Sequence, residues 1–276
     1  EFLQLTATEK EYARNQVLAG EEYVLINSYF KTTYIIRTRK FLHEFRIREE
    51  LRKTASNLSK LIKANNHHDL VIASDHGLAG STEAFTEGLV LSFYSFDKYI
   101  TRKDPDDKKS FPSNLLLYGE ISDDDFKWLD EITNAVCLVR DLINEPVNRL
   151  NAPALSEEIR NLGTKAGFRV DVFNKGKIEA LKMGGLLAVN RGSVDPPVFC
   201  ILEWKPENAV NSSPVVLVGK GIVYDTGGLN IKTGDYMDNM KADMAGAAAV
   251  TGTFYTIART NIPVHVVGLI PATDNR

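Results

Sequence analysis

Two lysines and two aspartates fall within one glycine-rich stretch of the chain, Val218 to Met244. Counted from Lys220, Asp225 lies 5 residues further along the chain, Lys232 lies 12 further and Asp243 lies 23 further. Spacing of this length lets a loop wrap around one centre. Aspartate carboxylates are hard oxygen ligands suited to Mg, Mn or Zn, and two such ions roughly 3.5 to 4 Å apart can hold a hydrolytic water and a substrate carbonyl. The stretch is therefore a candidate two-metal site.

The lysines can take part in such a site in two ways. Nearby dications disfavour the ammonium form, so a lysine can bind a metal as the neutral amine. A lysine held slightly further out stays charged and can polarise a carbonyl or stabilise an oxyanion.

Two other interpretations of these residues stay open from spacing alone. Lysines and aspartates in a loop are in most proteins solvated surface charges. Glycines at the end of a strand also expose backbone N–H groups that bind phosphate. Against phosphate, the sequence GKGIVYDTGG has neither the residue order of a P-loop nor that of a dinucleotide-binding turn.

A β-branched and leucine run, Pro214 to Val218, precedes the stretch and is typical of a fully buried strand. Ligands of open α/β sheets bind beyond the carboxyl ends of the strands, so the polar residues are expected to meet there. Upstream of this strand the sequence predicts a helix. Asn151 is its N-cap, Pro153 lies in its first turn, and Gly167 ends it. The other predicted elements are strands at Phe168–Phe173, Pro197–Trp204 and Ile262–Ile270, a tight turn at Met183–Gly185 and a closely packed helix at Gly246–Thr260.

The first part of the chain alternates strand and helix patterns, which indicates an α/β domain. Ser122 and Asp125 resemble a capping box, and the apolar stripe that follows predicts a long helix that Pro146 must end. We predict an N-terminal α/β domain over residues 1–120, a connecting helix over 121–150 and a second α/β domain over 151–276. Within the first domain we expect strands at Tyr23–Asn27, Thr32–Arg37, Leu70–Ala73 and Leu115–Tyr118, helices over 42–61 and 84–96, and a charged surface loop over 101–114.

Composition excludes several classes of function. Of the 276 residues 43% are hydrophobic and 25% charged, and the net charge is -3, so neither nucleic acid nor an anionic membrane is an expected partner. Cys137 and Cys200 lie in apolar contexts without metal-binding spacing, which is typical of core residues in a reducing, cytoplasmic protein. No apolar run reaches membrane-spanning length, and the first residues lack a signal-peptide core.

The glycine-rich stretch resembles the signature of the leucine aminopeptidase family, the cytosol aminopeptidases of peptidase family M17. Residues 219–228 read GKGIVYDTGG, Ile231 and Lys232 follow, and residues 237–248 read MDNMKADMAGAA. Upstream, NEPVN at 144–148 and MGGLLAV at 183–189 match further landmarks of the family. The resemblance is strong from residue 144 to 270 and only architectural before that.

The resemblance implies a zinc-exopeptidase-like α/β/α catalytic domain with Lys220, Asp225 and Asp243 as ligands of a two-metal centre. Lys232 would be the charged electrophile. Met240 would form a wall of the pocket for the first side chain of the substrate, with helix packing as its alternative role. In such enzymes an activated water attacks the first peptide bond and one ion holds the free amino group, so only N-terminal residues are released. The family further implies Zn or Mn, with Mg as an alternative, a bicarbonate base, a leucine-type preference on peptides, a homohexamer and a cytoplasmic location.

The family's second motif, similar to N-T-D-A-E-G-R, does not occur in the 276 residues. That motif supplies two more carboxylate ligands and the arginine that holds the bicarbonate, and residues 273–276 match an earlier loop instead. We therefore expect a fragment, truncated at both ends, that is inactive alone and has an unfinished sheet edge prone to association. The alternative is a non-catalytic binding or assembly protein that retains the fold, but a scaffold has no physical need for all four polar residues.

Overall fold

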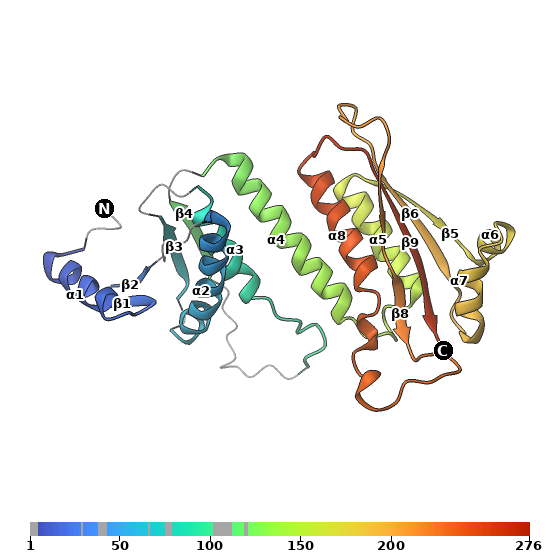
Figure 1. The fold of residues 1–276 in the computed structure, drawn as a ribbon, viewed down its shortest axis with the longest axis horizontal. Helices are drawn as coiled ribbons and strands as arrows, with labels where there is room; N and C mark the ends of the chain where they lie inside the picture. Colours follow the sequence, from blue (N-terminus) through green and yellow to red (C-terminus); the bar gives the residue numbers. More distant parts are fainter. Residues whose placement is uncertain are drawn as a thin grey trace. The chain divides into compact units, whose positions relative to one another are not determined.

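A computed structural model describes residues 5–28, 30–37, 43–65, 67–74, 79–101, 112–118 and 121–276. Contacts divide the chain into two compact units, the first made of Glu1–Ser95 with Tyr99–Phe126 and the second of Phe96–Lys98 with Lys127–Arg276. Both units contain helices and strands (Figure 1), which confirms the predicted mixed α/β class. The division into residues 1–120, 121–150 and 151–276 stays a prediction.

Unit 1 has a small core between two helices. Leu51, Ala55 and Leu58 of α2 pack with Phe85 and Leu89 of α3. The strands form two pairs: β1 with β2 is antiparallel, and β3 with β4 is parallel. Residues 102–111 of the expected charged loop lie outside the described residues. The elements of the unit are α1 (Ala7–Leu18), β1 (Tyr23–Ser28), β2 (Lys31–Ile36), α2 (Glu44–Ala64), β3 (Asp69–Ala73), α3 (Ser81–Ser92) and β4 (Asn114–Tyr118).

Unit 2 is built around a five-stranded mixed sheet. Its strands are β5 (Arg169–Phe173), β6 (Val198–Trp204), β7 (Val215–Val218), β8 (Gly221–Asp225) and β9 (Val266–Asn275). The order is β5-β6-β9-β7, and β8 also pairs with β9. β9 is antiparallel to β6 and parallel to both β7 and β8. The long strand β9 is thus the common partner of every strand in the sheet except β5.

Two long helices begin and end where the capping signals predict. The carboxamide of Asn151 accepts a hydrogen bond from Ala154 N–H at 3.0 Å, and Gly167 ends the same helix with a φ of 97°. Ser122 Oγ accepts from Asp125 N–H at 3.1 Å, and the helix that follows stops before Pro146. The helices from here to the end of the chain are α4 (Asp123–Asn144), whose residues up to Phe126 belong to unit 1, then α5 (Ala152–Ala166), α6 (Lys175–Ala180), α7 (Gly184–Val189) and α8 (Ala245–Arg259).

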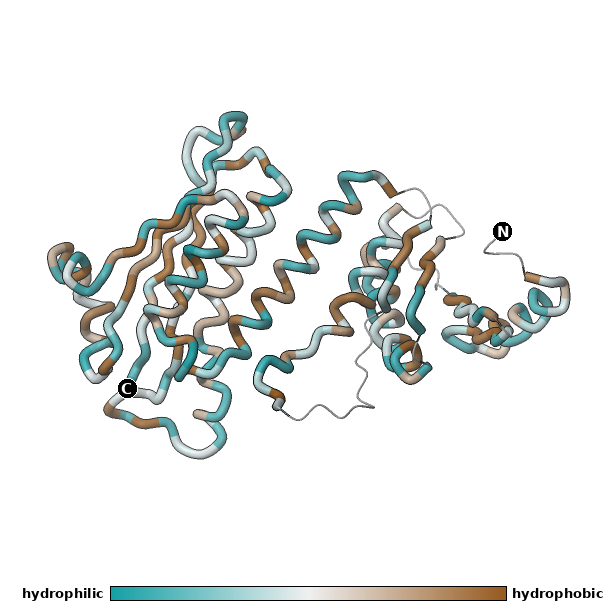
Figure 2. The backbone as a smooth tube through the Cα atoms, turned by 180° about the vertical axis from the view of Figure 1, so that it is seen from behind, coloured by the Kyte–Doolittle hydropathy of each residue, from teal (hydrophilic) through white to brown (hydrophobic). Residues whose placement is uncertain are grey.

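The core of unit 2 lies between the sheet and helices α5 and α8, which cover one of its faces (Figure 1). Phe254 of α8 is fully buried, and a side chain at Gly268 of β9 would lie 2.8 Å from its ring. Hydrophobic residues run along the sheet strands (Figure 2), and Cys200 and Ile270 are completely buried among them. The helix–sheet packing therefore holds β9 firmly in place.

Several sequence predictions were wrong in detail. The run at 215–218 was predicted to be a fully buried strand. It forms the strand β7, but the side chains of its valines are 49% to 69% exposed. Residues 221–225 form β8 rather than part of a loop, and the strand predicted at 262–270 instead spans 266–275. Met183–Gly185 is not a free turn, since α7 begins at Gly184. Helix α3 ends at Ser92, before the predicted residue 96. Within the described residues no helix is long and apolar enough to cross a membrane.

Candidate metal centre

Lys220 lies at a break between two strands that run along the same edge of β9. β7 pairs with residues 266–269 of β9, and β8 pairs further along the same strand. Gly219 N–H still donates to Leu269 O at 2.9 Å, but the carbonyl of Lys220 instead accepts from Ala247 N–H, in the first turn of α8, at 2.9 Å. The break thereby satisfies a helix-terminal N–H group and joins Lys220 to the start of α8.

Two glycines permit this close approach. A Cβ at Gly219 would lie 2.8 Å from Cα of Ala247, and a Cβ at Gly246 would lie 2.9 Å from the backbone nitrogen of Lys220. Both distances are shorter than side-chain carbons tolerate. The glycines of the GKG and AGAA segments thus have a common physical role, which is to let the strand break contact the N-terminus of the helix.

Asp243, two residues before α8, faces Lys220 across this contact. Lys220 Nζ lies 2.9 Å from Asp243 Oδ2, and the aspartate side chain is 20% exposed. Oδ2 is buried and accepts no hydrogen bond in the described part of the chain, so the lysine amine meets it as an ion pair only. A buried carboxylate oxygen with one cationic neighbour is costly unless a further cation or donor reaches it.

A bulge in β8 places Asp225 on the same face of the sheet as Lys220. Ile222 lies opposite Thr273 of β9, whereas Asp225 lies opposite Asn275, so β8 carries one extra residue between these positions. Five residues along a regular strand would put Lys220 and Asp225 on opposite faces. The extra residue reverses this, and bulges of this kind are common beside active sites.

The Asp225 carboxylate is held by three neighbours. Its Oδ1 accepts hydrogen bonds from Gly227 N–H at 2.9 Å and from the Asn275 amide at 2.7 Å, and its Oδ2 lies 3.2 Å from Lys232 Nζ. Burial alone would raise the pKa of Asp225, but these two hydrogen bonds and the lysine together hold that pKa below its ordinary value. The carboxylate is therefore kept in the charged form that a metal requires.

The double glycine after Asp225 turns the chain so that Lys232 returns to it. Gly227 and Gly228 have φ values of 92° and 70°, which side-chain-bearing residues rarely adopt. The turn is closed by Lys232 N–H, which donates to Thr226 O at 2.8 Å. The turn thus delivers the second lysine to the carboxylate that ends β8.

The structure thus joins the four predicted residues in two ion pairs, Lys220 with Asp243 and Lys232 with Asp225, and their convergence on one metal centre stays a prediction. Met240 lies half-buried at the start of a 3-10 turn, Met240–Ala242, and its predicted role stays a prediction. Sequence reasoning missed Asn275, whose only sequence signal is its polar character at the end of an apolar strand.

The residues present fit a divalent cation. Two carboxylates and an amine are a suitable donor set, and Asp243 Oδ2 is a buried oxygen that accepts no hydrogen bond in the described residues and has acceptor capacity for a cation beside its ion pair with Lys220. No group of three or more His, Cys, Asp or Glu side chains gathers anywhere in the described residues, at this site or another. The fit therefore rests on Lys220 together with Asp225 and Asp243.

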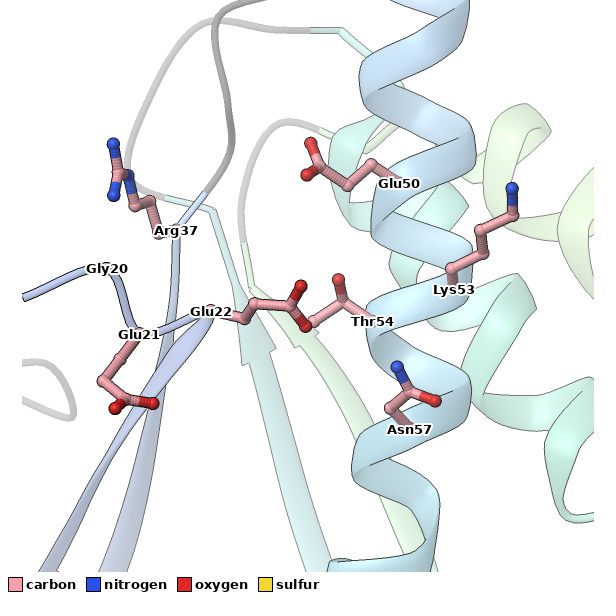
Figure 3. A pocket seen from close by; sticks show the side chains of 8 residues that line it. All are labelled: Gly20, Glu21, Glu22, Arg37, Glu50, Lys53, Thr54 and Asn57. Carbon is pink, nitrogen blue, oxygen red and sulfur yellow. The ribbon is translucent and has the colours of Figure 1, made fainter.

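A pocket of about 250 Å³ in unit 1 is unrelated to these residues. Helix α2 lines one side of it, and residues flanking β1 and β2 line the other (Figure 3). The lining mixes both signs of charge, which singles out no ligand class. Its residues are Gly20, Glu21, Glu22, Arg37, Glu50, Lys53, Thr54 and Asn57.

Comparisons with known proteins identify the family of the chain. Residues 137–276 match the model of the cytosol aminopeptidase family, catalytic domain. A probable cytosol aminopeptidase of Chlorobium limicola is 44% identical over 208 residues, which are 72% of this chain and 41% of that protein. Another, from Chloroherpeton thalassium, is 51% identical over 146 residues, which are 53% of this chain and 28% of that protein. The chain therefore spans less than half the length of these curated relatives.

Two solved structures share the fold. The bottromycin maturation enzyme BotP in complex with Mn superposes with a TM-score of 0.77 at 26% identity, covering 99% of this chain and 57% of that one. The cytosol aminopeptidase from Coxiella burnetii gives 0.76 at 23% identity, covering 99% and 55%. Because the family model matches half of the chain and includes all four site residues, the chain belongs to the cytosol aminopeptidase family, peptidase family M17.

Proposed function

We propose that the protein is a metal-dependent aminopeptidase that releases N-terminal residues from peptides through a two-metal centre. The observation that carries the proposal is the buried Oδ2 of Asp243, which lies 2.9 Å from Lys220 Nζ in an ion pair but accepts no hydrogen bond in the described part of the chain. An oxygen in this state is expected where a cation binds. The solved complex of BotP with Mn supports a divalent ion in this fold.

Lys220, Asp225 and Asp243 are the residues of this chain that would hold the ions. Divalent ions bound there would supply a nucleophilic water at neutral pH and polarise the scissile carbonyl. For Lys220 to contribute, its amine must lose a proton, which neighbouring dications favour. Asp225 is already ionised and fixed in orientation by the hydrogen bonds from Gly227 and Asn275, so it needs no rearrangement to accept a cation.

Lys232 is proposed to act on the substrate rather than on the ions. Its side chain is 29% exposed, and its Nζ lies 3.2 Å from Asp225 Oδ2. An ammonium in this position can donate a hydrogen bond to a carbonyl oxygen and stabilise the negative charge that develops there. This assignment gives the two lysines different tasks: Lys220 binds an ion, and Lys232 stabilises the transition state.

The remaining expectations rest on the family alone. They are a leucine-type preference, peptide substrates, Zn or Mn with Mg as an alternative, a bicarbonate base, a homohexamer and a cytoplasmic location. The relatives named as probable cytosol aminopeptidases support peptide substrates and the location only. Further carboxylate ligands and the bicarbonate-binding arginine would come from residues outside positions 1–276.

The test is hydrolysis of a leucyl anilide by the native protein, after chelation and after adding back Mn²⁺ or Zn²⁺. We expect release of leucine only with the added metal. N-acetyl-leucyl anilide is the matched control, because an aminopeptidase requires a free amino group, and it should not be cleaved. Absence of metal-dependent release would contradict the enzyme assignment and leave the non-catalytic binding or assembly protein as the interpretation.

A further inference from the structure

We propose that Asn275 is a positioning residue that fixes the orientation of the Asp225 carboxylate for metal binding. The inference deepens the proposed function and rests on it. Neither the sequence motifs nor the choice of metal ligands includes Asn275, which lies 50 residues from Asp225 along the chain.

Asn275 joins the ends of two neighbouring strands through both its side chain and its backbone. Its amide Nδ2 donates to Asp225 Oδ1 at 2.7 Å. Its carbonyl accepts from Thr226 N–H at 2.9 Å and from Thr226 Oγ1 at 2.8 Å. The end of β8 is therefore tied to the end of β9 at the residue that carries the candidate ligand.

These contacts give the two carboxylate oxygens of Asp225 different partners. Oδ1 of Asp225 accepts two N–H groups, from Gly227 and Asn275, which occupies both of its lone pairs. Oδ2 faces Lys232 and keeps acceptor capacity for a cation. The Asn275 amide thus prevents rotation about the Cβ–Cγ bond that would exchange the two oxygens.

A neutral amide suits this position better than the alternatives. A carboxylate at 275 would place two negative oxygens against each other, and an apolar side chain would leave Oδ1 with one donor fewer. Space is reserved for the amide as well, since a Cβ at Gly228 would lie 3.0 Å from Asn275 Oδ1. The side chain contacts Asp225, whereas the backbone carbonyl alone makes the contacts with Thr226.

This separation allows the positioning role to be tested apart from a structural one. Asn275→Ala removes the amide from Asp225 but keeps the backbone contacts. Thr226→Val removes the hydrogen bond from Oγ1 to the Asn275 carbonyl and the acceptor of Gly228 N–H, without removing a donor to Asp225. Asn208→Ala, in an exposed turn between β6 and β7, is the distant control. Mn²⁺ binding to the metal-free native protein is measured by calorimetry, and thermal unfolding is measured on each metal-free variant.

We expect Asn275→Ala to weaken Mn²⁺ binding by roughly 10-fold to 100-fold, the usual effect of removing a contact that orients a metal ligand. Thr226→Val should weaken Mn²⁺ binding by less than about 3-fold, even if this variant lowers the unfolding temperature as much as Asn275→Ala does. Asn208→Ala should bind like the wild type. Asp243→Asn is included to report on the metal site itself, and it should lose affinity as well.

The outcomes separate the two proposals. If the wild type binds Mn²⁺ and Asp243→Asn weakens binding while Asn275→Ala does not, the role of Asn275 is wrong and the metal site stands. If Asn275→Ala and Thr226→Val lower affinity alike, Asn275 serves only the strand junction and the positioning role is overturned. If the wild type binds no Mn²⁺, both the proposed function and this inference fail.

Discussion

The carbonyl of Lys220 accepts a hydrogen bond from the N–H of Ala247 at 2.9 Å, which fastens the strand break to the first turn of α8. This contact helps to set the distance between Lys220 and Asp243, because Asp243 lies two residues before the same helix. Backbone geometry therefore assembles one half of the candidate centre before any ion binds. The pairing of Lys220 with Asp243 therefore depends on two glycines, Gly219 and Gly246, which let the strand break approach the helix.

Gly246→Ala is expected to destabilise the protein although alanine is the better helix former. Its Cβ would lie 2.9 Å from Lys220 N, so the strand break must move away from α8, at a cost of about 1 to 3 kcal/mol. Gly176→Ala in α6 is the matched control, since its Cβ would meet only ordinary contacts. That change should be neutral or stabilise by up to about 1 kcal/mol. Urea unfolding measures both, and equal effects would contradict the steric argument.

Arg259→Met should lower the unfolding temperature by on the order of 5 °C, because it leaves a buried carboxylate without its cation. Arg259 Nη2 and Nε lie 2.7 and 2.9 Å from Glu131 Oε1, and Glu131 is 5% exposed. Arg160→Met removes an exposed pair with Glu157 and should change the temperature little.

Adding Glu131→Leu to Arg259→Met tests the same cause. The double variant should recover most of the lost stability, since no unpaired buried charge remains. A double variant less stable than the single one would show that the ion pair itself, not the stranded carboxylate, matters.

Cys200 should be unreactive in the folded protein and should make stability fall at alkaline pH. Burial raises the pKa of this thiol from 9.0 to about 12. The unfolded chain releases the proton at lower pH than the folded one, so stability is full below pH 9.0 and is lost as pH rises toward about 12. The free energy of unfolding, measured with urea, should fall between about pH 8 and about pH 10, and Cys200→Val should make that fall smaller by about 1 kcal/mol. Identical pH slopes for the two proteins would contradict this.

The elements with local signals were predictable from the sequence. Asn151 and Gly167 mark the two ends of α5 through hydrogen bonds and backbone angles that depend on neighbouring residues only. The four charged residues of the candidate centre were also predictable, because their types and spacing lie within one stretch.

Features that depend on pairing between distant strands were not predictable. The bulge in β8 exists only in register with β9, and the contact between Asn275 and Asp225 joins residues 50 apart. The valines of β7 show a related limit. β-branched residues favour a strand, but composition does not reveal which faces of that strand are covered. Val218, at 69% exposure, is the clearest case.

Lys232→Ala and Asp243→Ala should separate catalysis from metal binding. Lys232 pairs with Asp225 and is proposed to act on the substrate, so its loss should reduce leucine release by about 100-fold to 1000-fold while Mn²⁺ affinity changes little. Asp243 contributes a buried oxygen beside Lys220, so its loss should weaken both Mn²⁺ binding and turnover.

Lys205→Ala, after β6 on the surface, is the control for removal of a charge and should leave both Mn²⁺ binding and turnover unchanged. Anilide hydrolysis at saturating metal, together with calorimetry, gives the two readouts. Equal loss of metal in the Lys232 and Asp243 variants would mean that Lys232 belongs to the metal shell, and the division of roles between the two lysines would be wrong.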